Sequence, residues 1–141
     1  MFYDDLKMTG HLRITLNETV IHEVPNLVVT DGKEYVASRM KDTTKSAMSH
    51  MAIGTNSTAA AAGNSALGGE ADRQSLTSTT VSGAVVTYVA TFGPGDGTGA
   101  ITEAGLFNAS SSGDMLCRTV FAVVNKGASD SMTITWSVTV S

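Results

Sequence analysis

The chain has 141 residues, of which 42% are hydrophobic and only 16% are charged, and its formal net charge is −4. This length is typical of one domain with one hydrophobic core, and the few scattered basic residues argue against nucleic-acid binding, which needs clustered Lys and Arg. Cys117 is the only cysteine, so an intramolecular disulfide is excluded. The acidic start of the chain does not resemble a signal peptide. No apolar run reaches the roughly 20 residues of a membrane span.

A strand hairpin followed by a helix is predicted near the start of the chain. Residues 11–17 alternate between apolar and polar side chains, which is the period-two pattern of a half-buried strand, and residues 19–24 are its predicted partner. The turn falls at Asn17 and Glu18, without the Gly that a tight hairpin usually has. Asp31, with Glu34 three residues later, is typical of a helix start, and we expect about ten helical residues to follow.

The middle of the chain contains a short apolar strand and a segment of small residues. The strand is predicted over residues 46–53 and ends at Gly54. Residues 56–69 are mostly Ala, Gly, Ser and Asn, which bury too little apolar surface to offset the entropy lost on ordering. We therefore predict a flexible arm or loop near residues 56–69 that becomes ordered against a neighbouring molecule.

The second half of the chain is rich in strand patterns. Strands are predicted over residues 75–81, 84–92, 101–108, 115–124 and 131–140, and the last one alternates without interruption. The glycine-rich residues 93–99 have neither the Lys of a phosphate loop nor the repeated acidic ligands of a calcium loop, so they are interpreted as a flexible hairpin connection. Roughly eight strands at this spacing predict one all-β domain over residues 1–141: an antiparallel β-sandwich, which could be a jelly roll, with one short helix.

Four charged residues stand out within otherwise neutral, strand-rich sequence: Glu70, Arg73, Glu103 and Arg118. A carboxylate pair among them could act as acid and base. The favoured alternative is structural, with Glu103 and Arg118 on neighbouring strands forming an ion pair that fixes strand register. We expect no catalytic, cofactor or metal site.

Cysteine and histidine residues give little sign of chemistry. Cys117 could be a nucleophile, but a lone cysteine between Leu116 and Arg118 is more often a small core residue. His11, His22 and His50 lack the spacing of metal ligands and are interpreted as surface or interface residues.

Several segments together resemble a family of tailed-bacteriophage structural proteins. In chain order they are NLVVTDGK (26–33), MAIGT (51–55), Leu67 with Glu70 and Arg73, EAGLFN (103–108), MLCRTVF (115–121) and ITW (134–136). The resemblance spans about residues 26–138. It implies a β-sandwich module that serves as a capsid cement or decoration protein, or as a module of tail fibres and baseplates.

The resemblance implies a structural role and no enzymatic activity. Because the sequence has neither a collagen-like period nor a heptad shaft, we favour a capsid cement protein over a tail-fibre or baseplate module. Its expected partners are copies of itself, as dimer or trimer, and the major capsid protein, with no direct contact to nucleic acid or membrane. We expect assembly in the host cytoplasm and a place on the capsid exterior. A carbohydrate-binding receptor domain is less favoured, since only 6% of the residues are aromatic.

Overall fold

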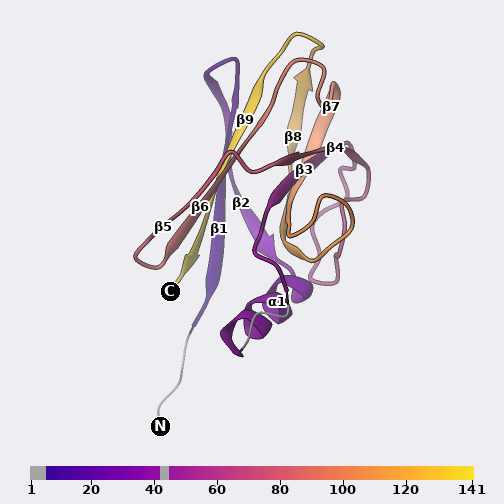
Figure 1. Ribbon diagram of the computed structural model, residues 1–141. Helices are drawn as coiled ribbons and strands as arrows, with labels where there is room; N and C mark the ends of the chain where they lie inside the picture. The colour runs from indigo at the N-terminus through magenta and orange to yellow at the C-terminus, as the bar shows by residue number, and fades with distance from the viewer. Residues whose placement is uncertain (1–5, 42–44) are drawn as a thin grey trace.

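The computed structural model describes residues 6–41 and 45–141, and these ranges contain nine strands and one helix (Figure 1). In chain order the elements are β1 (Met8–Leu16), β2 (Thr19–Val28), α1 (Thr30–Lys41), β3 (His50–Gly54), β4 (Glu70–Ser75), β5 (Ser78–Ser82), β6 (Val85–Phe92), β7 (Gly99–Phe107), β8 (Met115–Lys126) and β9 (Met132–Val140). The predicted all-β character with one short helix is confirmed.

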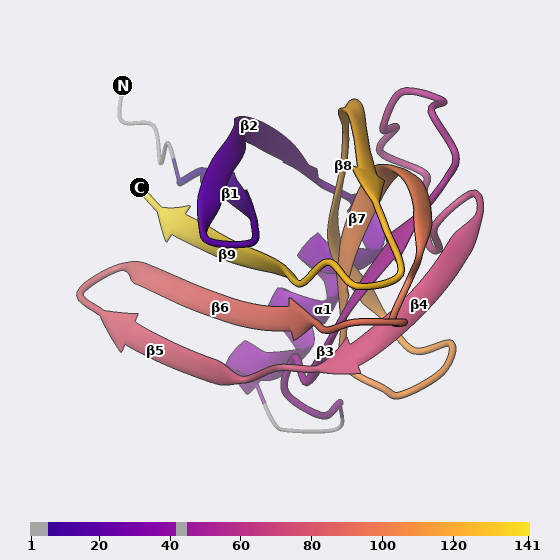
Figure 2. The ribbon, with the colours of Figure 1, turned by 90° about the horizontal axis from the view of Figure 1, so that it is seen from above.

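The strands form one antiparallel sheet in the order β4-β3-β7-β8-β2-β1-β9-β6-β5, and this sheet curls into a half-barrel (Figure 2). The predicted two-sheet sandwich, including its jelly-roll form, is therefore wrong. The reason lies in β2, which pairs with β1 along most of its length and with β8 through Leu27 and Val28. One strand thus belongs to both halves of the sheet, and no break separates two layers.

The two edge strands, β4 and β5, follow each other directly along the chain. Between them, the backbone N–H of Leu76 donates to the carbonyl oxygen of Ser49 at 2.9 Å, and that of Thr77 donates to Val89 at 2.7 Å. The chain therefore passes from one edge of the curled sheet to the other. The strand predicted over residues 75–81 is split here because its pairing partner changes from β3 to β6.

The core fills the concave side of the sheet, where the predicted alternation of β9 is confirmed. Its residues Met132, Ile134 and Trp136 are fully buried, and Leu12 of β1 lies opposite Trp136. β6 contributes the buried Tyr88, Ala90 and Phe92 from one of its faces. Each fully buried large apolar side chain contributes about 1.5–3 kcal/mol to folding.

Helix α1 is present as predicted, but its start is built differently. The Asp31 carboxylate accepts a hydrogen bond from the backbone N–H of Met115 on β8 at 2.7 Å, so it caps a strand rather than pairing with Glu34. The N–H of Thr30 instead donates to the carbonyl oxygen of Ala62 at 2.8 Å. Burial, followed by the nearby Asp114, raises the pKa of Asp31. Across the described ranges, no helix has the length and apolarity needed to cross a bilayer.

The glycine-rich segment 93–99 is not the predicted hairpin connection. It joins β6 to β7, which are not neighbours in the sheet, and so carries the chain from one half of the half-barrel to the other. The buried ammonium of Lys126 donates to the carbonyl oxygen of Gly93 at 2.8 Å. This bond ties the crossing segment to the end of β8.

Candidate functional site

The four candidate charges form two separate ion pairs. Arg118 Nη2 lies 3.0 Å from Glu103 Oε1, and Arg73 Nη2 lies 2.7 Å from Glu70 Oε1. Glu103 is on β7 and Arg118 on the neighbouring β8, where the ladder places Arg118 opposite Gly105. The Glu103 and Arg118 side chains are only 0% and 3% exposed, so this pair lies in the interior.

The Glu103 carboxylate is the centre of a dense hydrogen-bond network. Its Oε1 accepts from Arg118 Nε at 3.2 Å and Nη2 at 3.0 Å, and from the backbone N–H of Gly68 at 2.9 Å. Its Oε2 accepts from the backbone N–H groups of Asn56 at 2.9 Å and Gly69 at 2.7 Å. Consecutive backbone N–H groups are a common way to bind an anion, and here the anion is a side chain of the same protein.

Arg118 uses its remaining donors on the same segment. Its Nη1 lies 3.2 Å from Asn64 Oδ1 and its Nη2 lies 3.5 Å from Asn56 Oδ1. The ion pair therefore binds both ends of the segment that the sequence predicted as an arm. The flexibility of its exposed middle stays a prediction.

Apolar packing adds a second anchor for this segment. Leu67 is buried in a small cluster on the outer side of the main core, together with Val29, Ala52, Phe107 and Met115. Gly54 lies beneath the segment, and a Cβ there would be 2.6 Å from Glu103 Oε2 and 2.5 Å from the carbonyl oxygen of Gly69. The Gly at this position is what allows the carboxylate and the loop to approach β3.

The second ion pair holds a different loop. Arg73 binds Glu70 through Nε and Nη2, and its Nη1 donates to the carbonyl oxygens of Ala109 at 3.0 Å and Ser112 at 2.8 Å. The guanidinium carbon lies 3.9 Å from the centre of the Phe107 ring, which is a cation–π contact. Arg73 thus fastens the connection between β7 and β8 to the edge strand β4.

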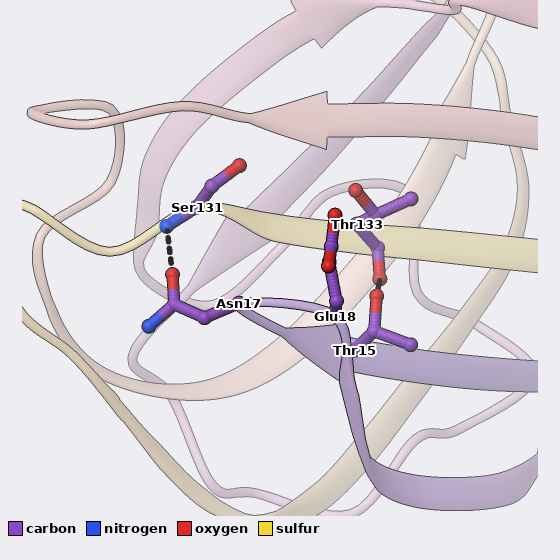
Figure 3. Close-up of a pocket in the computed structure, with 5 residues that line it drawn as sticks. All are labelled: Thr15, Asn17, Glu18, Ser131 and Thr133. Carbon is purple, nitrogen blue, oxygen red and sulfur yellow. Dashed lines mark hydrogen bonds between the residues drawn. The ribbon is translucent and has the colours of Figure 1, made fainter.

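A polar pocket of about 400 Å³ lies at the turn between β1 and β2 (Figure 3). Its lining residues are Thr15, Asn17, Glu18, Ser131 and Thr133. Thr15 Oγ1 donates to the carbonyl oxygen of Thr133 at 3.2 Å, and Asn17 Oδ1 accepts from the N–H of Ser131 at 3.0 Å. The first bond joins β1 to β9, and the second joins the β1–β2 turn to the residue before β9, so hydrogen bonds between lining residues hold the pocket walls together.

The cysteine and histidine residues considered from the sequence take no part in either ion pair. Cys117 is fully buried, and burial raises the pKa of its thiol well above the usual value, which disfavours the reactive thiolate. His22 Nε2 bonds the carbonyl oxygen of Ala122 at 2.8 Å, and His50 Nδ1 bonds Ser49 Oγ at 2.7 Å. Within residues 6–41 and 45–141, no three His, Cys, Asp or Glu residues are grouped to hold a metal ion.

Sequence reasoning singled out the four charges but missed their partners. The backbone N–H groups of Asn56, Gly68 and Gly69 donate to Glu103, and Asn64 Oδ1 accepts from Arg118; all four residues come from a segment distant in sequence. The clustering of Asn and Gly in residues 54–69 was the available signal, because such residues favour turns that expose backbone N–H groups. The chain matches no protein-family model, and comparison with curated proteins and with solved structures found no match.

Proposed function

We propose that the protein is a non-enzymatic structural subunit of a tailed-bacteriophage particle, and that it acts as a capsid cement protein on the exterior of the shell. The observation that carries the proposal is the ordered resemblance of six segments between residues 26 and 138 to virion proteins of this kind. Five of these segments meet in one half of the molecule, on or beside β3, β7 and β8.

These segments supply the residues that fix two loops. The Glu103–Arg118 pair holds both ends of residues 56–69, and the Glu70–Arg73 pair holds the β7–β8 connection. Fixed loops suit a protein that must fit several neighbours, because preordered groups lose less entropy on binding. The proposed role of these charges is therefore to shape a contact surface.

The mechanism we propose is mechanical. Shell proteins are held together by many modest lateral contacts, and a subunit that bridges several major capsid protein molecules adds buried area that must be lost before the shell opens. The charge-poor, Ser- and Thr-rich exterior supports this role, since each charge buried in a contact would need a partner.

Two alternatives remain as outcomes of the test. A tail-fibre or baseplate module would share the resemblance. A carbohydrate-binding domain would use exposed aromatic side chains for stacking, whereas every aromatic residue in the described part of the chain is buried: Tyr35, Tyr88, Phe92, Phe107, Phe121 and Trp136. This distribution favours an assembly role over sugar recognition.

Deleting the gene and comparing DNA release with host adsorption tests the proposal. Without a cement protein, shells should still form but should lose their DNA on heating or at low salt, because the barrier to opening falls. Adsorption of intact particles should be unchanged, and wild-type particles should carry the protein in hundreds of copies. Heat-stable, full heads that fail to adsorb would contradict the capsid placement and favour a tail module.

A further inference from the structure

The two edges of the curled sheet differ sharply in charge. Edge strand β4 carries Glu70, Asp72 and Arg73, whereas β5 carries no charge, and no charged residue occurs anywhere in residues 74–95. All five residues of β5 are exposed, and Val81 is 70% exposed. Soluble proteins usually protect such edges with charges, Pro or bulges, because an open strand edge can pair with another chain.

The backbone of β5 has unpaired groups on its open side. Among residues 6–41 and 45–141, β5 pairs with β6 alone, through a two-residue turn in which Gly83 has φ 57 and which closes the pair Ser82 and Val85. In such a hairpin the closing pair exchanges both of its hydrogen bonds, and hydrogen-bonded pairs then alternate along the ladder. It follows that Thr79 and Val81 point their N–H and C=O groups away from β6.

We propose that this edge is a self-association surface: β5 pairs antiparallel with β5 of a second copy about a two-fold axis at Thr80. In that register, Thr79 of one copy lies opposite Val81 of the other, so the outward N–H and C=O groups of both residues find partners. The two Thr80 side chains face each other across the axis. The two half-barrels then share one continuous sheet.

Three features favour a second copy over another partner. A two-fold pairing satisfies the same groups on both sides, so one strand supplies the whole contact. Each copy has a net charge of −4, which makes charged faces repel, while the β5–β6 hairpin is neutral. Val81 also lies opposite Val86, which packs against the core, so a second copy's Thr79 would cover an apolar side chain at the margin of that core.

The contact is short, and this sets the expected affinity. A five-residue strand edge buries less than a standard stable interface, so the dissociation constant should lie on the order of micromolar. Inside a particle, neighbouring copies would pair more completely because tethering raises their effective concentration. The dimer does not depend on where in a particle the protein lies. The dimer proposal can therefore be wrong while the proposed function is right, and the proposed function can be wrong while the dimer forms.

Sedimentation equilibrium on the purified full chain tests the dimer. Thr80→Lys places two like charges opposite each other and should weaken dimerisation about tenfold or more. Thr19→Lys is the matched control, because Thr19 is also an exposed strand threonine but lies on β2, and it should dimerise as the unaltered chain does. Mixing Thr80→Lys with Thr80→Glu should restore association, since opposite charges then meet at the axis.

Disulfide trapping gives a second measurement. Opposed residues at a non-hydrogen-bonded antiparallel pair lie within disulfide reach, so Thr80→Cys should form a covalent dimer under mild oxidation, whereas Thr19→Cys should not. The buried Cys117 does not compete in the folded chain. A chain that stays monomeric at about 1 mM overturns the proposal. A dimer that survives Thr80→Lys, or one that Thr19→Lys weakens equally, also overturns it.

Discussion

At the scale of single residues, the Glu103–Arg118 pair should be the most sensitive point of the fold. Glu103→Ala and Arg118→Ala should each lower the free energy of unfolding by roughly 2–4 kcal/mol, because each leaves an unpaired charge in the interior. The double variant should be less destabilised than the sum of the two single variants, since no charge is then left alone. Chemical denaturation of the four proteins measures this coupling.

An exposed pair gives the matched control. Arg13 Nε lies 3.1 Å from Glu23 Oε1, but these side chains are 56% and 48% exposed. Solvent screens such a pair, and removing either member should change stability by no more than about 0.5–1 kcal/mol. Equal losses at the exposed and buried pairs, or simple additivity of Glu103→Ala and Arg118→Ala, would show that the buried network does not act as a unit.

The pairing of Glu103 with Arg118 could be predicted from the sequence, but the other groups that bind Glu103 could not. Opposite charges on two neighbouring predicted strands were enough to suggest Glu103 and Arg118 as partners. The N–H donors of Asn56, Gly68 and Gly69 could not be assigned to Glu103, because Asn and Gly indicate a turn but not the residue that it contacts, and these donors lie 34 to 47 positions away along the chain. Asp31 shows the same limit, since its bond to Met115 is a tertiary contact that overrides a local helix-start pattern.

At the scale of elements, the β1–β2 turn holds Glu18 in a strained, left-handed backbone conformation. Asn17 and Glu18 both have positive φ, 48° and 71°, as a two-residue turn of this kind requires. Glu18→Gly should raise the free energy of unfolding by about 0.5–1 kcal/mol, because Gly adopts this conformation without a side-chain clash. Denaturant melts of the variant and the unaltered chain measure the gain.

Asn17→Gly is the contrasting variant at the adjacent position. Asn17 Nδ2 donates to Asp130 Oδ1 at 2.8 Å, and Asn17 Oδ1 accepts from the N–H of Ser131. The bond from Asn17 Nδ2 lowers the pKa of Asp130. The Asn17→Gly variant should therefore be less stable than the unaltered chain despite the relieved backbone. If Asn17→Gly is as stable as the unaltered chain or more stable, the turn is not held by the Asn17 side chain; if Glu18→Gly loses stability, the backbone at Glu18 is not strained.

The positions of strands could be predicted, but their pairing could not. The alternation of β9 marked both the strand and its buried face, because period two is a local property of the backbone. Pairing is non-local: β2 finds β1 next to it but also reaches β8 about ninety residues further on. Without that shared strand, roughly eight alternating segments are equally compatible with a two-layer sandwich.

At the scale of the whole molecule, the curled sheet buries three titratable side chains, those of Tyr35, Tyr88 and Cys117, in the same core. Burial is the main reason that the pKa of Tyr88 is raised to about 12, and nearby Tyr35 and Cys117 add to it. Burial also raises the pKa values of Tyr35 and Cys117. All three groups are therefore held in their neutral, protonated forms by the fold itself.

Alkaline unfolding should follow from this arrangement. A tyrosine in the unfolded chain titrates near pH 10, whereas Tyr88 in the folded chain titrates at about 12, so the folded state binds the proton more tightly. The stability that Tyr88 contributes is fully present below about pH 10 and falls by up to about 1.4 kcal/mol per pH unit as the pH rises towards 12. Thermal melts at stepped pH values should show this decline.

Tyr88→Phe separates the titration of Tyr88 from general damage by alkali. The variant keeps the ring in the core but removes the ionisable hydroxyl, so its stability at pH 7 should stay within about 1 kcal/mol of the unaltered chain. Above pH 10 its stability should decline less steeply than that of the unaltered chain, and the difference between the two curves should widen up to about pH 12. Parallel curves over this range would mean that Tyr88 titrates alike in the folded and unfolded chain, and that the concave side of the half-barrel is open to solvent at this residue.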